Sequence, residues 1–164
     1  CIEIAGVQGD ATNTARMEGY REGVNEAGGE FLDNETQYAN ATADLAVTAM
    51  EGIMSKYPDG VAIICSNNDD MALAAARTAK SNPNYAKTIF LGFDGQKSAC
   101  EAVAAGELTM TAAQNNFDIG YKAVETMVKI LKGEQYDKVV DTGTEIITKD
   151  NAQARLDNFA NWLK

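Results

Sequence analysis

The stretch from Val61 to Ala76 constrains the fold of this chain more than any other. It begins with the apolar, β-branched run Val61–Cys65, which is typical of a strand buried on both faces of a parallel sheet. Five polar residues follow, Ser66–Asp70, and an alanine-rich run of helical character comes next. Open α/β sheets present ligand-binding groups at such junctions between a strand and the following helix.

The rest of the chain repeats this order of strand and helix. Apolar runs, helix caps and Gly or Pro stops predict strands over 2–6, from 31, over 61–65, 88–93, 109–113 and 145–148, and helices over 14–27, 40–56, 70–80, 97–105, 118–132 and from 150. The alternation predicts an α/β fold in which helices flank a parallel sheet and right-handed crossovers join its strands.

The composition excludes several classes of function. Lys and Arg number 14 against 24 Asp and Glu, a net charge of −10, which disfavours nucleic acid and anionic membrane surfaces as partners. The sequence contains no histidine, so a Ser-His-Asp triad and a Cys/His zinc site are excluded. No run reaches the ~18 apolar residues of a membrane span. We therefore expect neither nucleic-acid binding nor direct membrane insertion.

The three cysteines, Cys1, Cys65 and Cys100, show no paired spacing, and their odd number rules out complete pairing within the chain. Cys65 lies in a predicted strand and Cys100 in a predicted helix, where a small buried side chain is expected. The sequence starts directly in a strand, without a signal-peptide pattern. We expect Cys1 to lie inside a longer sequence.

Four polar side chains lie at or just beyond the ends of predicted strands. Arg16 is just inside the first helix, Asn68 follows the strand over 61–65, and Asp94 and Gln114 close the next two strands. The carboxyl ends of parallel strands share one edge of a sheet, so these side chains should converge. Arg, Asp, Asn and Gln together offer planar donors and acceptors that suit neighbouring sugar hydroxyls.

Each of these positions also has a purely structural interpretation. Asn68 and Asp69 suit helix capping, and Asp94-Gly95 is a common turn pair. We expect Asp69 to act as a cap beside the site, and Asp10, in the turn before the first helix, as a second supporting residue. The sequence has neither a phosphate-binding glycine motif nor the spacing of an EF-hand loop, so no metal site and no cofactor are predicted.

The motifs resemble those of periplasmic sugar-binding proteins of the ribose/galactose type, whose fold is shared with lactose-repressor-like regulators. The resemblance covers essentially the whole chain and is carried by Thr14–Tyr20, Asn67–Ala72, Gly92–Gly95 and Ala113-Gln114. The second and third motifs are specific when they occur together in this order.

The resemblance implies a role for each matching residue. Arg16 matches the arginine that clamps sugar hydroxyls, Asn68 a ligand-binding asparagine, and Asp94 the aspartate of the GFDG motif. Gln114 matches the glutamine at the interdomain crossover, where glucose/galactose-binding members have asparagine, and this favours ribose-like chemistry. The chain departs from many relatives in lacking an aromatic residue near Ala41, where Tyr38 is the nearest candidate.

The resemblance also implies a division of the chain. Residues 1–114 form the C-terminal ligand-binding lobe of a two-lobe protein, and the N-terminal lobe is largely missing. Residues 115–140 form a helix and a strand that belong to that missing lobe. Residues 141–164 return as a strand and a terminal helix.

The function that the resemblance implies is capture of a pentose or hexose in a cleft between the two lobes. Its expected partners are the sugar, the missing lobe and the membrane permease of an ABC importer, to which the sugar is delivered without chemistry. The expected location is extracytoplasmic, in the periplasm or, lipid-anchored in a Gram-positive organism, at the cell surface.

Two other classes of function remain open. An effector-binding domain of a lactose-repressor-like regulator would have a DNA-binding headpiece upstream, and those relatives more often read GFDD than GFDG. An enzyme would use Asp94 and Asp69 as acid and base, but no nucleophile, metal cluster or cofactor loop accompanies them.

Overall fold

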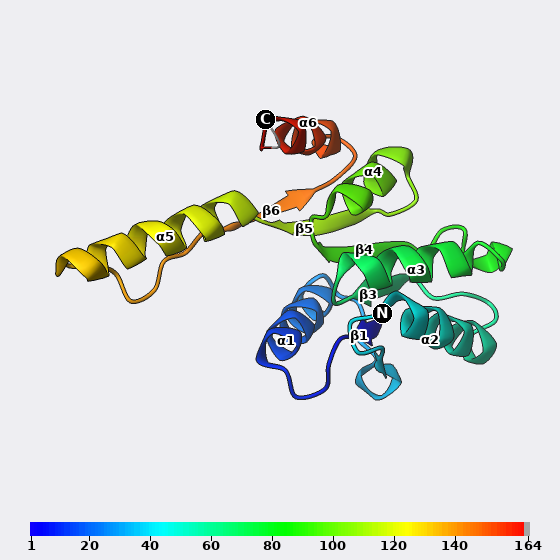
Figure 1. Cartoon of the computed structure of the whole chain (residues 1–164). Coiled ribbons are helices and arrows are strands. Elements are labelled where there is room, and N and C mark those ends of the chain that lie inside the picture. The colour runs from blue at the N-terminus through cyan, green and yellow to red at the C-terminus, as the bar shows by residue number, and fades with distance from the viewer. Residues whose placement is uncertain (163–164) are drawn as a thin grey trace.

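The computed structural model describes residues 1–162, and the last two residues of the predicted terminal helix, 163–164, lie outside the described residues. Strands and helices alternate along the chain (Figure 1). The strands are β1 (Ile2–Ala5), β2 (Gln37–Tyr38), β3 (Ile63–Ser66), β4 (Ile89–Asp94), β5 (Met110–Gln114) and β6 (Thr144–Ile147). The α-helices are α1 (Ala11–Glu26), α2 (Ala43–Lys56), α3 (Asp69–Ala79), α4 (Lys97–Ala105), α5 (Asn116–Lys132) and α6 (Ala152–Trp162).

The strands form one sheet in the order β2-β1-β3-β4-β5-β6. The first five are parallel to their neighbours, and β6 runs antiparallel to β5. The chain passes from β1 to β2 on one side of β1, and then crosses back to β3 on its other side. The carboxyl edge between β1 and β3 is therefore a topological switch point. The α/β fold predicted from the sequence is confirmed.

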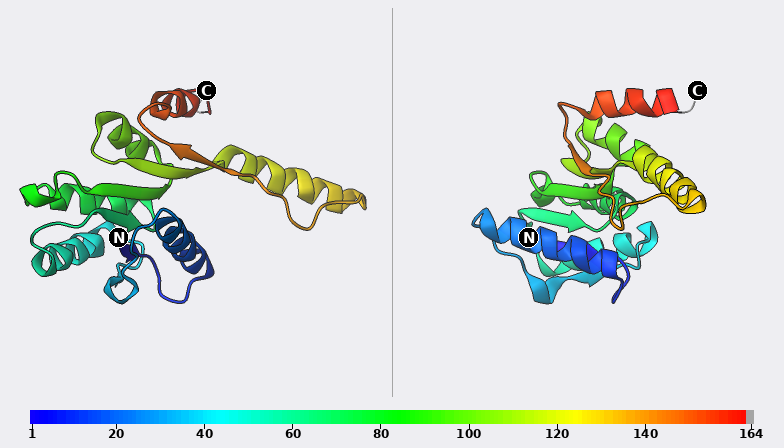
Figure 2. Two further views of the ribbon diagram at one scale, coloured as in Figure 1. Left: turned by 180° about the vertical axis from the view of Figure 1, so that it is seen from behind. Right: turned by 90° about the vertical axis from the view of Figure 1, so that its left-hand side faces the viewer.

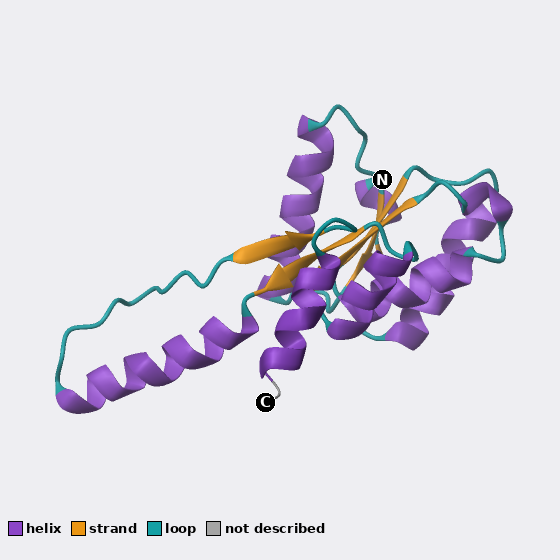
Figure 3. Cartoon of the chain, turned by 90° about the horizontal axis from the view of Figure 1, so that it is seen from above, coloured by secondary structure: helices purple, strands orange, loops and turns teal. Residues whose placement is uncertain are grey.

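Helices cover both faces of the sheet, but unequally. Seen from above, α1 lies on one face, and α2, α3, α4 and α6 lie on the other (Figure 3). The fully buried side chains include Ile2 and Ile4 from β1, Ile64 from β3, and Met50 and Met71 from the helices over them. Small alanine side chains along α3 let this helix pack closely on α2 and β4.

Two predicted elements differ from the structure. The second strand was expected from residue 31, but Phe31 is buried ahead of a 3-10 turn (Asp33–Glu35), and β2 has only two residues. A salt bridge of 2.6 Å between Arg21 and Asp33 holds that turn against α1. The strand expected within 115–140 is absent, because residues 133–143 run without a neighbouring strand that would supply hydrogen bonds.

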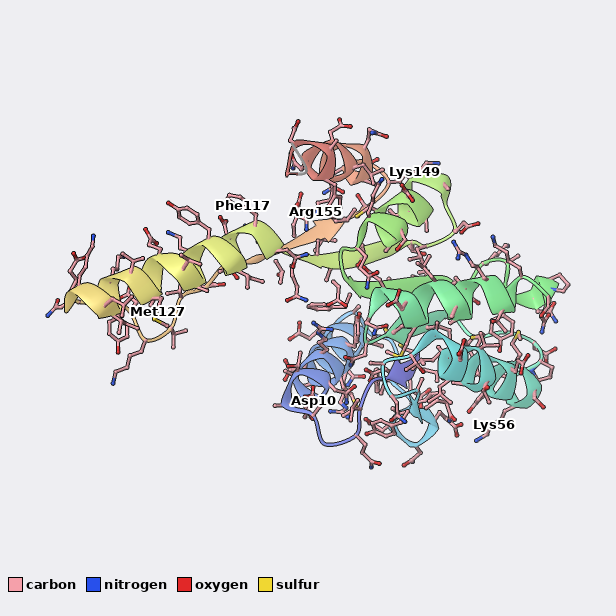
Figure 4. The ribbon with its side chains drawn as sticks, in the orientation of Figure 1. Asp10, Lys56, Phe117, Met127, Lys149 and Arg155 are labelled. Carbon is pink, nitrogen blue, oxygen red and sulfur yellow. The ribbon has the colours of Figure 1, made fainter. Side chains whose placement is uncertain are left out.

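Helix α5 projects away from the body of the molecule (Figure 2). None of its residues is buried, although the helix is amphipathic. Its apolar side chains stand along the projecting helix, as the labels at Phe117 and Met127 show (Figure 4). After the loop that follows, β6 returns to the sheet beside β5, and α6 packs on α4. Within residues 1–162, the length and apolar character required to cross a bilayer do not occur together in any helix.

Candidate functional site

Three of the predicted site residues meet at the carboxyl edge of the sheet. Arg16 reaches over from α1, Asp94 ends β4, and Gln114 ends the adjacent strand β5. Oδ1 of Asp94 accepts hydrogen bonds from Arg16 Nη2 at 3.0 Å and from Gln114 Nε2 at 2.7 Å. The side chains of Arg16 and Asp94 are 15% and 24% exposed, so the ion pair is screened from bulk solvent but still reachable by a ligand.

The guanidinium of Arg16 is fixed from three sides. Besides its bond to Asp94, its Nη1 donates to the carbonyl oxygen of Asn67 at 2.8 Å. Its Cζ atom lies 3.9 Å from the centroid of the Phe93 ring, a cation–π contact. The Phe93 ring is half-buried beneath Arg16. A guanidinium held in this way is oriented before any ligand arrives, which lowers the entropic cost of binding.

Backbone strain is concentrated at the same edge. Among residues 1–162, three residues other than glycine have positive φ: Asn40 at 48°, Ala41 at 61° and Asp94 at 112°. All three follow or end strands of the parallel part of the sheet. Such conformations cost about 1–3 kcal/mol each and cluster at ligand-binding and active sites. The strain at Asp94 therefore marks this residue independently of its hydrogen bonds.

Asn68 lies at the same edge but has other partners. Its Oδ1 accepts from the backbone N–H of Met71 at 2.9 Å and caps α3, and its Nδ2 donates to the carbonyl oxygen of Ala41 at 3.1 Å. Both roles considered from the sequence are therefore geometrically available: Asn68 caps the helix and stands half-buried beside the strained turn at Asn40 and Ala41. Its predicted role toward a ligand stays a prediction.

The expected capping role of Asp69 is wrong, because Asn68 is the N-cap of α3. Asp69 is fully buried, and its carboxylate accepts from Thr111 Oγ1 at 2.6 Å and from the N–H of Gln96 at 2.7 Å. Burial raises the pKa of this carboxyl to about 6, against the hydrogen bonds from Thr111 and Gln96. Asp69 thus ties β5 to the turn that follows Asp94.

Asp10, the second supporting candidate, caps the helix that carries Arg16. Its Oδ1 accepts from the N–H of Asn13 at 2.7 Å, and α1 begins at the next residue. This cap explains why α1 starts at Ala11 rather than at residue 14 as predicted. Asp10 therefore supports the site by fixing the start of α1.

Sequence reasoning missed a buried polar layer beneath the site. Asn67 Nδ2 donates to Glu3 Oε1 at 3.1 Å and to the carbonyl oxygen of Asn13 at 3.2 Å. The hydroxyl of Tyr20 donates to the carbonyl oxygens of Ser66 and Gly92 at 3.1 and 3.2 Å. The spacing of Tyr20, one helical turn beyond Arg16, was the available signal that both side chains face the same strand ends.

Gln114 is held from the opposite side by α6. Arg155, 5% exposed, donates from Nη2 to the backbone carbonyl oxygen of Gln114 at 2.8 Å, and it lies between α6 and the end of β5 (Figure 4). A cavity of about 730 Å³ opens beside Arg16 and Gln114 and continues along the face of β4 and β5 next to α1. Within residues 1–162, no group of three or more His, Cys, Asp or Glu side chains is arranged to hold a metal ion.

Together, the fold and the site define a class of protein: an open α/β lobe with a rigid set of polar donors and acceptors at the carboxyl edge of its sheet. Comparison with known proteins agrees. Residues 1–135 match the family described as periplasmic binding protein domain, and the chain belongs to this family.

Individual relatives are similar over most of the chain. The ribose import binding protein RbsB of Escherichia coli (strain K12) is 32% identical over 148 residues, which are 90% of this chain and 49% of the relative. The D-allose-binding periplasmic protein of the same organism is 32% identical over 125 residues, 76% of this chain and 40% of the relative. The crystal structure of a Caulobacter myo-inositol binding protein has 26% identity and a TM-score of 0.84, covering 96% of this chain and 54% of that one.

The chain therefore spans about half the length of the relatives it matches. That share agrees with one lobe of a two-lobe protein. The relatives are named as binding proteins. This confirms the prediction that the family is one of ribose-type binding proteins rather than one of enzymes.

Proposed function

We propose that the protein is an extracytoplasmic solute-binding protein that captures a sugar, and that Arg16, Asn68, Asp94 and Gln114 form one wall of the binding cleft. The observation that carries the proposal is the pair of hydrogen bonds converging on Asp94, a residue held in a strained backbone conformation. A rigid carboxylate between an arginine and a glutamine matches the alternating donor and acceptor character of neighbouring sugar hydroxyls.

Binding requires no chemistry. Without sugar, Arg16, Asp94 and Gln114 satisfy one another's polar groups. A sugar hydroxyl donates to the Asp94 carboxylate and accepts from Arg16, so the ligand replaces water and adds charge-assisted hydrogen bonds without reorganising the site. Phe93 and Asn67 keep the guanidinium in place during the exchange.

The second wall of the cleft belongs to the other lobe. Periplasmic binding proteins are known examples of hinge closure around a ligand. We assign residues 115–140 to the other lobe, because α5 has no buried residue in this chain. The junction between β5 and α5 and the return of the chain into β6 supply two crossings between the lobes next to Gln114.

The sugar is a pentose or hexose, or a cyclic polyol of similar shape. Relatives named for ribose, allose and myo-inositol share several adjacent hydroxyls on a compact ring. Gln114 at the crossover favours ribose-like ligands. Delivery to the permease of an ABC importer is supported by relatives named as import binding proteins. We propose that the protein acts in the periplasm or, with a lipid anchor, at the cell surface.

The proposal is tested by thermal melting of the longer protein that contains this chain, with a panel of D-ribose, D-allose, D-fructose, D-galactose and myo-inositol. A ligand that binds only the folded state raises the melting temperature, and the stabilisation grows with the logarithm of its concentration relative to Kd. We expect one or a few related sugars to raise it. No shift with any pentose, hexose or cyclic polyol would contradict the proposal.

A further inference from the structure

Two of the three thiols of the chain lie against each other. The Sγ atoms of Cys1 and Cys65 are 3.3 Å apart, although 64 positions separate these residues in the sequence. Cys1 directly precedes β1, and Cys65 lies in the neighbouring parallel strand β3. Cys100 lies in α4, where its thiol faces the carbonyl oxygen of Gly95.

The strand register places both thiols on the same face of the sheet. Glu3 is paired with Cys65, and Cys1 is two residues before Glu3, so the side chains of Cys1 and Glu3 leave β1 on the same side. A disulfide bond of ~2.05 Å is about 1.3 Å shorter than the present separation of the two sulfur atoms. Cys1 is the partly exposed member of the pair, so this movement falls to its side chain.

We propose that Cys1 and Cys65 form a disulfide bond when the protein meets an oxidant of the small-molecule disulfide class. The compartment in which this occurs rests on the proposed function, since disulfides form and persist outside the cytoplasm. The bond joins β1 to β3 and closes a loop that contains α1, β2 and α2.

The two cysteines have different exposure, which sets the order of the steps. Cys65 is fully buried, whereas Cys1 is partly exposed. Burial, with a smaller contribution from the Glu3 carboxylate, raises the pKa of the Cys65 thiol to about 12. Cys1 therefore attacks first, because it alone of the two is open to the oxidant.

The reaction consists of two thiol–disulfide exchanges. Cys1 loses its proton to solvent, and its thiolate attacks one sulfur of oxidised glutathione, which forms a mixed disulfide and releases one glutathione thiolate. Cys65 then loses its proton, attacks the Cys1 sulfur, breaks the mixed disulfide and releases the second glutathione thiolate. The released thiolates take up the two protons. The two cysteines are oxidised, and one glutathione disulfide is reduced to two thiols.

The test uses the Cys100→Ala variant of the longer protein, in which Cys1 and Cys65 are the two thiols of this chain. After incubation with oxidised glutathione, both thiols should be lost, the intact mass should fall by two hydrogen atoms, and digestion should yield a peptide linking Cys1 to Cys65. Oxidation should also raise the melting temperature, because the cross-link restricts the unfolded chain. Two free thiols, a persistent glutathione adduct or a Cys1–Cys1 dimer would each overturn the inference.

Two control variants accompany this test. Adding Cys65→Ala should stop the reaction at the glutathione adduct on Cys1, and adding Cys1→Ser should leave Cys65 unmodified, because Cys65 is buried. If the first control fails to fold, the second still decides, because an adduct on Cys65 would contradict the proposed order. A protein that forms the bond but binds no sugar would contradict the proposed function and leave this inference standing.

Discussion

The buried carboxyl of Glu3 shows how individual residues set the stability of this protein. Glu3 is fully buried in β1, where its Oε1 accepts from Asn67 and its Oε2 has no hydrogen-bond partner within residues 1–162. Burial raises its pKa from 4.5 to about 7, although the bond from Asn67 and the charge of Arg21 act in the opposite direction. The folded state therefore holds a proton on Glu3 that the unfolded chain releases.

This shift predicts a falling stability as pH rises. The stability contributed by protonated Glu3 is complete below about pH 4.5 and is lost as the pH rises to about 7. Asp69 acts with the same sign up to about pH 6. Replacing Glu3 by Gln should raise stability above pH 7 by up to ~3 kcal/mol.

The measurement is urea unfolding at several pH values between about 4.5 and 7, the window between the ordinary and the raised pKa of Glu3. Glu3→Gln should reduce the slope of unfolding free energy against pH, and Glu22→Gln, an exposed control on α1, should not. An unchanged slope in Glu3→Gln would show that Glu3 is already ionised in the folded protein.

A second prediction concerns the close approach of β4 to Asp69. A methyl group added at Gly92 would collide with the Asp69 carboxylate and press on Ala72. Gly92→Ala should therefore destabilise the protein by about 1–3 kcal/mol, as overpacking does elsewhere. Gly52→Ala is the matched control, because nothing lies near this helical position, and it should stabilise α2 by about 0.5–1 kcal/mol. Chemical denaturation measures both, and equal stability of Gly92→Ala and the unchanged protein would refute the packing described.

Much of the candidate site could be predicted from the sequence at this scale. Asp94 and Gln114 end neighbouring strands, and Arg16 lies in the helix that follows β1. Parallel strands bring their ends to one edge whatever the details of packing. The bonds of Asp69 and Glu3 could not be predicted, because they depend on which strands are neighbours. A carboxylate next to a helix start looks like a cap until the position of Thr111 on β5 is known.

At the scale of elements, α5 is the part of the chain whose role depends on what lies outside it. Its pattern predicts an amphipathic helix, and the structure has one, with Val124 and Leu131 at 66% and 79% exposure. The apolar stripe alone could not reveal this exposure, since it indicates that a partner exists but not where it lies. Only the resemblance, which assigns residues 115–140 to a missing lobe, pointed to it. The prediction of a strand after α5 is wrong for a related reason. A strand needs a neighbouring strand to pair with through backbone hydrogen bonds, and the sequence pattern does not show whether one is there. Its assignment to the other lobe stays a prediction.

This assignment predicts a difference in hydrogen exchange. In the 164-residue chain, amides of α5 should exchange much faster than those of α3, because α5 lacks the buried contacts that hold α3 in place. In the longer protein with its second lobe, α5 should gain protection while α3 stays unchanged. Equal protection of the two helices in the 164-residue chain would contradict the account of α5.

At the scale of the whole molecule, the chain is one α/β lobe, and the carboxyl edge of its sheet carries the proposed binding residues. The order of strands and helices was predictable because each βαβ unit buries an apolar strand under an amphipathic helix. The second lobe could not be predicted from such patterns, because only resemblance to longer relatives indicates it. A single lobe contacts one side of a sugar, so the 164-residue chain should bind far more weakly than the longer protein.

The most direct test of the central claim is calorimetric titration of the longer protein with the sugar that gives the largest thermal shift. The account predicts that Asp94→Ala weakens binding at least about 100-fold, because a carboxylate that accepts hydroxyl protons and orients Arg16 is lost. Circular dichroism should show an unchanged fold, and Asp59→Ala, an exposed aspartate after α2, should bind as the unchanged protein does. Asp94→Ala with the affinity of the unchanged protein would contradict the account.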